Sequence, residues 1–405
     1  MPSVNEETGV NERGRTFADF DHNDSTLGAR EFRARHTQMR ERCPVAHSDR
    51  HGGFDVVTRY DEVREALSAP TIFSSADGVF IPPTGTPRAA AMEFDDPQHA
   101  VWRRIMEPPL TVRAVRAFEP TILEIADFLI DDFASRGSAD LVRELAEPLP
   151  SIVIGRVVGL DHDESLAARD VAARLYSSIG TSEFSVEMEA FGDFVESQLA
   201  SRRSHPRQDF LSDLASGTVE GMPIDSDGVS SLMLAYLLGG HHSTGSGIAA
   251  LLHDILTRED VRQAVTSADD NQKAMTRAVD ESLRLNTPLQ YFARTVVQDT
   301  TIADERIEQG SRILLDLAAA NRDPRRFEDP EEFHLDRRRN AHIAFGGGSH
   351  VCLGQHLARA EIRVTVSRVL ERLPDLQLTE ECQEKVVAGK LLTTESLPVV
   401  FSAEV

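Results

Sequence analysis

One cysteine of the chain has neighbours that would make it a reactive thiolate. Residues 345–354 read FGGGSHVCLG, so Cys352 follows a glycine-rich stretch and directly precedes an apolar segment of helical periodicity. Glycines let a backbone bend tightly and approach a flat ligand closely, and the partial positive charge of a helix N-terminus stabilises a thiolate. Such a thiolate is a good ligand for iron, including the iron of haem. The alternative is an inert, buried cysteine, which is the usual fate of a lone thiol.

The segment fits the pattern F-G-x-G-x-H/R-x-C-x-G, and on this pattern the sequence resembles the cytochrome P-450 family of haem-thiolate enzymes. The resemblance extends from about residue 50 to the end of the chain. It implies haem b as the cofactor, with the Cys352 thiolate as axial ligand of the iron. It also implies that Phe345, Gly346 and Gly354 shape the haem-binding loop and that His350 contacts a haem propionate.

A second stretch, DPQHAVWRR at residues 96–104, resembles the D-P-x-H-x-x-x-R helix of the same family. His99 and Arg103 are four residues apart and therefore share a helix face. Haem carries two propionates, which need cationic or donor partners when they are buried. By resemblance, His99 and Arg103 supply one set of these contacts, and Arg294 and His350 supply the others. The alternative for His99 is a capping or surface residue near the start of the helix.

Glu281 and Arg284 match the E-x-x-R helix of the family. Opposite charges three residues apart lie on one helix face, and an exposed pair of this kind is worth only ~0.3 kcal/mol. The resemblance instead implies a buried ion pair, completed by Arg337, that holds the core beside the cysteine loop. Arg338 is the alternative third member.

A long helical pattern over residues 229–257 is interrupted by Gly239 and Gly240. Each glycine in a helix interior costs roughly 1 kcal/mol relative to alanine. By resemblance, this helix passes over the iron, and the missing side chains leave space for dioxygen and substrate. In the direct register, His242 and Ser243 replace the acid and the threonine that the family has here.

The replacement changes the groups available to move protons. Oxygen activation in the family needs two protons delivered at the iron, and we predict that Ser243 and His242 deliver them, because serine keeps the hydroxyl and histidine exchanges protons near neutral pH. A structural hydrogen bond is the alternative for His242. Thr244 is the working hydroxyl if the helix register slips by one, and Gly240 belongs to the same group of catalytic candidates. His241 falls at a variable position and is expected to pack or to face solvent.

Four stretches line the substrate pocket by resemblance: the loop at 77–91, the glycine-interrupted helix, the stretch after Pro288 and the turn near Thr393. The matching residues are Phe80, Ile81, Leu238, Gly239, Gln290, Phe292 and Thr393. Most of them are apolar, which favours a small or medium-sized apolar or aromatic substrate, with Gln290 as one polar anchor.

The elements that must position these residues are mostly helices. Apolar residues three and four apart predict helices at 61–68, with Asp61 as N-cap, and at 119–135, 151–158, 185–201, 229–257 and 353–373. Short β-like runs are predicted at 54–58, 295–297, 302, 312–315 and 392–401. Residues 77–91 and 203–228 are expected to be loops, and residues 1–28 a flexible polar tail. We therefore predict a mainly α (α+β) protein, one large helical domain of the cytochrome P-450 type over residues 29–405 with a small β-rich region.

Composition restricts the partners. The chain of 405 residues carries 66 acidic and 43 basic residues, a formal charge of -23, which argues against nucleic acid and against an anionic membrane surface. Three cysteines, Cys43, Cys352 and Cys382, cannot form a disulfide framework. The polar start predicts no signal peptide, and the longest apolar run, 232–238, is too short to span a bilayer. We expect a cytosolic protein.

The charge is unevenly distributed along the sequence. Residues 337–372 contain two acids and seven arginines, at positions 337, 338, 339, 359, 363, 368 and 372. This basic stretch surrounds Cys352, and a basic patch on an acidic protein would steer an acidic electron donor such as a ferredoxin. The alternative is that some of these arginines form internal ion pairs.

The leading hypothesis is a haem-thiolate monooxygenase that inserts one oxygen atom from O2 into a small-molecule substrate. The sequence contains no second cysteine cluster for an iron–sulfur domain, so a separate ferredoxin and its NAD(P)H reductase would supply the electrons. The departure at His242 and Ser243 leaves a second hypothesis, a peroxide-driven or reductase-independent haem enzyme that catalyses rearrangement or dehydration. A third, a non-catalytic haem sensor, is disfavoured because no output domain is evident.

Overall fold

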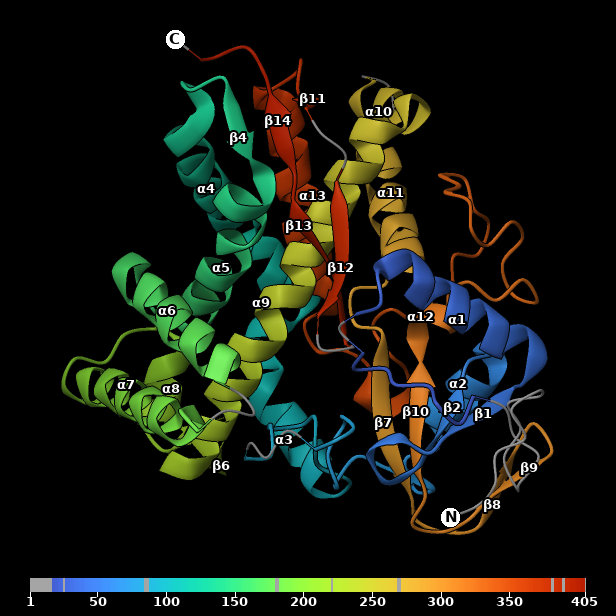
Figure 1. Ribbon diagram of the computed structural model, residues 1–405. Coiled ribbons are helices and arrows are strands. Elements are labelled where there is room, and N and C mark those ends of the chain that lie inside the picture. Colours follow the sequence, from blue (N-terminus) through green and yellow to red (C-terminus); the bar gives the residue numbers. More distant parts are fainter. Residues whose placement is uncertain are drawn as a thin grey trace. The chain divides into compact units, whose positions relative to one another are not determined.

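A computed structural model describes residues 17–24, 26–83, 87–178, 182–219, 221–267, 271–379, 382–387 and 390–404. The chain divides into two compact units, each assembled from three stretches that are separate in sequence. Unit 1 comprises Met1–Pro83, Asp280–Cys352 and Glu384–Thr393, and unit 2 comprises Thr84–Val279, Leu353–Gln383 and Thr394–Val405. Helices predominate among the described residues, and the strands are short, so the prediction of a mainly α fold with a small β-rich region is confirmed (Figure 1).

The helices are α1 (Ala29–Arg42), α2 (Tyr60–Ser68), α3 (Gln98–Met106), α4 (Val112–Ala134), α5 (Pro148–Val158), α6 (His162–Ser178), α7 (Phe184–Ser204), α8 (Phe210–Ala215), α9 (Ser226–Thr257), α10 (Glu259–Thr266), α11 (Asn271–Asn286), α12 (Leu317–Ala320) and α13 (Gln355–Arg372). Four short helical turns are η1 (Arg50–Gly52), η2 (Pro108–Leu110), η3 (Val142–Ala146) and η4 (Gly348–His350). The strands are β1 (Val45–Ser48), β2 (Phe54–Val57), β3 (Phe73–Ser74), β4 (Ser138–Asp140), β5 (Thr218–Val219), β6 (Met222–Pro223), β7 (Tyr291–Val296), β8 (Thr300–Ile302), β9 (Glu305–Ile307), β10 (Arg312–Asp316), β11 (Gln377–Leu378), β12 (Gln383–Val387), β13 (Leu391–Ser396) and β14 (Pro398–Val400).

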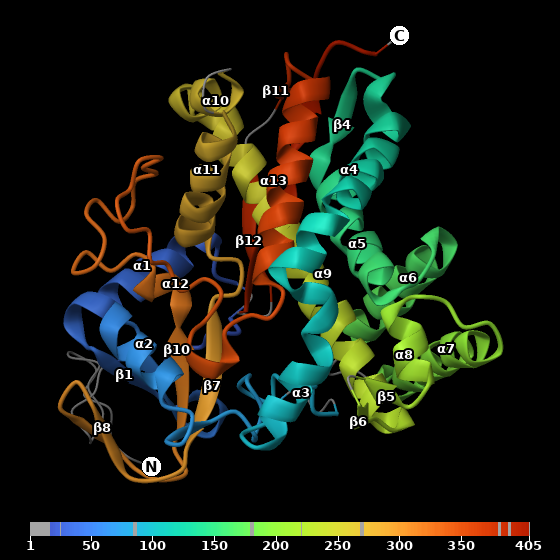
Figure 2. The same cartoon turned by 180° about the vertical axis from the view of Figure 1, so that it is seen from behind.

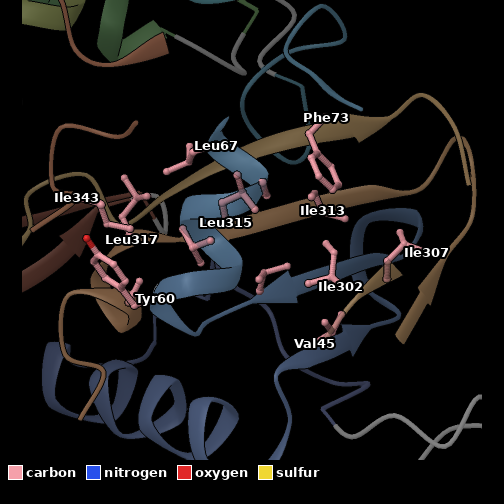
Figure 3. Close-up of a cluster of buried hydrophobic side chains, with 14 of the residues drawn as sticks. Val45, Tyr60, Leu67, Phe73, Ile302, Ile307, Ile313, Leu315, Leu317 and Ile343 are labelled. Carbon is pink, nitrogen blue, oxygen red and sulfur yellow. The ribbon is translucent and has the colours of Figure 1, made fainter. Parts of the chain in front are cut away.

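Unit 1 is built on a sheet of strand order β1-β2-β10-β7-β3. The β10 strand pairs in parallel with β2 and antiparallel with β7. One face of this sheet packs against α2, where Leu67 joins Ile313, Leu315 and Ile343 in a buried cluster (Figure 3). The opposite face packs against α1, with Phe32 in the second cluster. Because side chains alternate along a strand, both faces of the central strands must be apolar.

Residues 17–24 do not form the loose tail predicted for residues 1–28, whose first sixteen residues lie outside the described part of the chain. Phe20 and His22 are each 1% exposed. A ring nitrogen of His22, Nε2, lies 2.6 Å from the carbonyl oxygen of Ile81. The polar composition of this segment concealed a buried aromatic residue that anchors it to the core of unit 1.

Unit 2 is a helical assembly in which α13 packs against α4 and α9, and α5 packs against α6 and α9. Figure 2 shows α13 beside α4, with α9 crossing behind α13. The expected loop at 203–228 contains α8 and the β5–β6 hairpin. The sequence interpretation missed α8 because its apolar residues, Phe210, Leu211 and Leu214, are few, and the polar residues around them resemble a linker.

The starts of α2 and α13 differ from the predicted ones. Helix α2 begins at Tyr60 with Arg59 as N-cap, so Asp61 lies inside the first turn. The Tyr60 amide instead donates to a carboxylate oxygen of Asp323 at 3.0 Å, a cap supplied from a distant part of the sequence. The last long helix, α13, begins at Gln355, so Cys352 lies three residues before its first turn.

A buried cluster of charges connects α11 to the segment that precedes the cysteine loop. Glu281 and Arg284 are 1% and 0% exposed, and an oxygen of Glu281 lies 2.8 Å from Arg284 Nη2. The side chain of Arg337 completes the cluster, with its Nε 2.9 Å from the same carboxylate. The structure therefore contains the three-membered cluster that the sequence predicts, with Arg337 rather than Arg338 as its third member, since Arg338 is exposed.

The cluster predicts a strong dependence of stability on the charge of Glu281. Replacing Glu281 by Gln should lower the free energy of unfolding by about 3–5 kcal/mol, because two largely buried guanidinium groups lose their counter-charge. Urea unfolding followed by circular dichroism measures the change. Glu332→Gln is the matched control, because only its main-chain carbonyl accepts bonds from Arg284 and Arg337 and its side chain is exposed. Equal losses in the two variants would contradict the prediction.

Candidate functional site

The loop that carries Cys352 is shaped by two glycines with left-handed backbone. Gly346 and Gly348 have φ values of 71° and 62°. A Cβ atom at Gly348 would lie 2.2 Å from the main-chain oxygen of Leu67, so only glycine fits where the loop contacts α2. The Cys352 amide donates to the Phe345 carbonyl at 2.8 Å, which closes the loop. Contacts within the protein therefore hold the backbone around the cysteine.

The side chain of Cys352 is exposed, whereas the loop behind it is packed. The thiol is exposed, and the glycines that precede it leave room for a flat ligand. This arrangement fits a thiolate-ligated cofactor such as haem. The direct contribution of a helix N-terminus is smaller than predicted, because α13 starts three residues later with Gly354 as its N-cap. A Cβ at Gly354 would meet no atom within 4 Å, so the space beside this residue is open.

Strand β7 carries two of the candidates on one face. Phe292 and Arg294 are two residues apart and so point to the same side of the sheet, which is opposite to Tyr291 and Ala293. Arg294 is 4% exposed, with Nη1 donating to the Ala293 carbonyl at 2.8 Å. A buried guanidinium needs anionic or acceptor partners, which suits contact with a propionate. The other candidate of unit 1, His350, is half-buried in η4.

The predicted propionate contacts of unit 2 lie on α3. His99 is buried, so it is not a surface residue, and its Nδ1 is 3.4 Å from the Asp96 carboxylate, which leaves open the alternative of a capping residue near the helix start. Burial lowers the pKa of His99, which favours a neutral ring that contributes a hydrogen-bond donor rather than a charge. One turn later on the same helix, Arg103 is half-buried and would supply the cationic partner.

The glycines of α9 have different surroundings. Gly239 is exposed and has open space where a Cβ would be, whereas a Cβ at Gly240 would lie 3.2 Å from Ile154 of α5. One turn further along, a Cβ at Gly245 would lie 2.6 Å from the Ala146 carbonyl oxygen. Of these three glycines, only Gly239 leaves space beside the helix. Gly240 and Gly245 serve close helix packing, which corrects the expectation that Gly239 and Gly240 both make room for ligands.

Ser243 shares the open face with Gly239. Its Oγ donates to the Gly239 carbonyl at 3.2 Å, whereas Thr244 is only 5% exposed.

The rings of His241 and His242 are stacked with centroids 4.2 Å apart. Burial lowers the pKa of His241 to about 3, and its ring bonds the Glu147 backbone, so it packs as expected. Burial also lowers the pKa of His242, so this ring is neutral near pH 7.

Three of the four predicted pocket stretches meet within unit 1. The amide of Gln290 donates to the Lys390 carbonyl at 2.7 Å, and the rings of Phe80 and Phe292 have centroids 6.4 Å apart. The side-chain amide of Gln290 donates to the Thr287 carbonyl, so the polar anchor predicted at Gln290 is engaged within the protein. Ile81 belongs to the buried cluster beneath α1, and Thr393 is half-buried. The side chain of the remaining candidate, Leu238, lies outside the described part of the structure.

Among the interactions of the described residues, at least four of the seven arginines in the basic stretch form ion pairs with acids of the protein, as the alternative interpretation proposed. Their partners are Glu281 for Arg337, Glu119 for Arg363, Asp127 for Arg368 and Asp131 for Arg372. The other three are Arg338 and Arg339, which are exposed, and Arg359, whose Nη1 bonds the side chain of Gln355.

A groove of about 350 Å³ in unit 2 collects basic side chains from two helices, α4 and α13. Its lining includes His356, Arg359 and Arg363 of α13 together with Arg116 and Glu119 of α4. Sequence reasoning did not single out Arg116, because it is distant in sequence from the basic stretch and only the packing of α4 on α13 brings it there. It also missed Lys390, which the hairpin of β12 and β13 places beside Phe80.

Comparison with known proteins identifies the family. The sequence model of cytochrome P450 matches residues 184–400. A steroid C26-monooxygenase of Mycolicibacterium smegmatis is 33% identical over 383 residues, covering 93% of each chain. A nocardicin C N-oxygenase of Nocardia uniformis is 32% identical over 385 residues, covering 92% of this chain and 94% of the relative. The crystal structure of CYP108D1 from Novosphingobium aromaticivorans, 24% identical, has the same fold, with a TM-score of 0.85 and 100% of both chains covered.

The fold and the cysteine loop thus define a haem-thiolate protein. The chain belongs to the cytochrome P450 family, and it is an oxidoreductase, a P450 monooxygenase that incorporates molecular oxygen. Its cofactor is haem b with a cysteine thiolate as axial ligand. Among the described helices, none is long and apolar enough to cross a membrane.

The exposure of Cys352 predicts which of the three cysteines ligates the iron. Cys352→Ser should abolish the red-shifted absorbance band that carbon monoxide gives with reduced, thiolate-ligated haem, because a serine oxygen is a much poorer iron ligand than a thiolate. Cys43→Ser and Cys382→Ser are the matched controls and should keep the band, since neither residue lies in a comparable loop. Retention of the band in the Cys352 variant would refute the assignment.

Proposed function

We propose that this P450 inserts one oxygen atom from O2 into an apolar or aromatic molecule of small to medium size, with electrons from a separate ferredoxin and its NAD(P)H reductase. The observation that carries the proposal is the exposed thiol of Cys352 at the end of a loop that Gly348 fixes against α2. The cytosol is the proposed location, because the low cysteine count suits a reducing compartment.

The candidate residues would have separate roles in binding haem and substrate. Haem supplies the iron at which O2 is reduced. Cys352 holds that iron, and His99, Arg103, Arg294 and His350 would bind the propionates as donors or cations. The apolar surfaces of Phe80 and Phe292 would hold the substrate and exclude water. According to their names, one relative acts on steroids and another on nocardicin C. Substrates of such different structure among relatives are consistent with a pocket that accepts molecules larger than a single ring.

Proton delivery is assigned to Ser243 and His242. Ser243 is half-buried on the open face of α9, whereas Thr244 is only 5% exposed and faces the packed side. The neutral ring of His242 can accept a proton on one nitrogen and release one from the other, which allows relay without a permanent charge. This arrangement favours the direct register, with Ser243 as the working hydroxyl.

Ser243→Ala and His242→Ala should each raise the peroxide released per NAD(P)H consumed and lower product formation by about a hundredfold or more, because a positioned proton donor contributes roughly that much. Thr244→Val is the matched control and should remain coupled. Peroxide and product are measured in the same reaction. Unchanged coupling in both the Ser243 and His242 variants, or uncoupling only in Thr244→Val, would contradict the assignment.

A peroxide-driven reaction is the second candidate, and the replacement of the family's acid by His242 favours it. A histidine near the iron can move the proton of hydrogen peroxide between its two oxygens as a general acid–base. Product formation with hydrogen peroxide alone, compared with ferredoxin, reductase and NAD(P)H, separates the two candidates.

The basic groove of unit 2 is the proposed docking surface for the electron donor. It combines Arg116, His356, Arg359 and Arg363 around one acid, Glu119. On α13, Glu361 does not offset these charges, because burial raises its pKa well above the ordinary value and favours the neutral acid. A positive groove on an acidic protein would orient an acidic ferredoxin.

Arg359→Glu should slow the first electron transfer from a plant-type [2Fe–2S] ferredoxin by roughly tenfold at low salt and blunt its salt dependence. Arg363→Glu should act in the same direction. Stopped-flow absorbance of the haem measures the rate at several ionic strengths. Arg203→Glu, which changes the charge equally at an exposed position of α7, is the control. An Arg359 variant as fast as this control at low salt would refute the docking surface.

A further inference from the structure

Lys390 holds an ammonium group against the aromatic side chains of unit 1. Its Nζ lies 4.1 Å from the centroid of the Phe80 ring, and Phe80 lies beside Phe292. The main chain fixes this position, because the Lys390 carbonyl accepts the Gln290 amide and the adjacent Leu391 forms a β-bridge with Leu289. Three stretches of the predicted substrate pocket therefore converge on one lysine that sequence reasoning did not select.

The ammonium group of Lys390 is partly buried, and no acid among the described residues balances its charge. Burial lowers its pKa, and no neighbouring carboxylate in the described part of the chain opposes this shift. The Phe80 ring supplies a cation–π contact. An aromatic face accepts no hydrogen bond of ordinary strength from the three N–H groups of an ammonium, so a carboxylate arriving there would be strongly attracted.

The side chains beside Lys390 form an apolar surface, against which the apolar part of a bound carboxylic acid would lie. Phe80 and Phe292 are both half-buried, so part of each ring remains accessible. Phe292 shares its face of β7 with Arg294, the candidate propionate contact two residues away. A molecule lying along Phe292 would thus have its apolar part on the haem-binding side of β7 and its acidic part at Lys390.

We propose that Lys390 determines substrate specificity by pairing with a carboxylate, so that the enzyme oxidises carboxylic acids whose apolar part lies against Phe80 and Phe292. This inference rests on the proposed function and names its substrate class. The competing explanation is that Lys390 only fastens the β12–β13 hairpin to Phe80 through the cation–π contact.

Binding to the haem-containing enzyme provides the first test. Dodecanoic acid and dodecan-1-ol, and 4-butylbenzoic acid and 4-butylbenzyl alcohol, are two pairs that differ mainly in the acidic group. Titrated against the haem absorbance, each acid should bind the natural enzyme about tenfold more tightly than its alcohol. Lys390→Met should lose this preference while its affinity for the alcohols stays the same, and Lys390→Arg should keep part of it. Lys385→Met, an exposed lysine of β12, is the matched control and should keep all of it.

Carbon-13 NMR gives a readout that does not depend on turnover or on the haem spectrum. The chain has three lysines, Lys273, Lys385 and Lys390, so labelling at Cε yields few signals, and Lys390→Met and Lys385→Met assign them. Dodecanoate should shift the Lys390 signal, and dodecan-1-ol should leave it in place. A purely structural lysine would respond to neither ligand, or equally to both.

The outcomes separate this inference from the function on which it rests. If the acids bind the natural enzyme no more tightly than the alcohols, or if Lys390→Met keeps the preference, the inference is overturned while the carbon monoxide band of the thiolate-ligated haem leaves the proposed function standing. If that band is absent from the natural enzyme, the proposed function fails and the substrate assignment fails with it.

Discussion

The carboxylate of Glu281 is the group on which the geometry around the cysteine loop depends. It accepts from Arg284 and Arg337 and also from the His334 amide and the Asn340 side chain. A buried charge is unfavourable unless each of its acceptors is used, so the positions of the residues that donate to it are tightly restricted. Such a cluster is weak evidence for net stability, and its physical effect is to select one arrangement of the chain.

The cluster reaches the cysteine loop through Asn321. Arg284 donates to the Asn321 carbonyl, while the Asn321 side chain accepts the Ile343 amide at 2.8 Å and donates to Thr287. Ile343 is anchored in the apolar cluster of Figure 3, and three residues later Gly346 turns the chain toward Cys352. The ion pairs of Glu281, the side-chain amide of Asn321 and the apolar packing of Ile343 thus follow one another along the path to the cysteine loop. Each of them holds the segment of backbone that leads to the next.

The sequence predicted the chemistry of the candidate site better than its packing. The E-x-x-R helix, Arg337, and most helices were predictable, because charges and apolar periodicity act over three or four residues. Helix α4 starts at Val112, seven residues before the predicted start at Glu119, and Pro120 lies inside it, where a proline is unfavourable. The cap of α2 by Asp323 and the contact of Gly240 with Ile154 depend on residues distant in sequence, and no local pattern encodes such contacts.

Arginine and lysine side chains have different roles in this acidic protein. Arginines predominate, and on α13 they are fixed by carboxylates of α4, as Arg368 and Arg372 are by Asp127. The planar guanidinium matches a carboxylate in a defined direction, which suits a permanent contact between two helices. Lysine carries a compact charge with no preferred plane, and Lys390 meets an aromatic face rather than an acid. Within the described part of the chain no carboxylate balances Lys390, whereas many arginines are paired, and a ligand explains such a cation better than stability does.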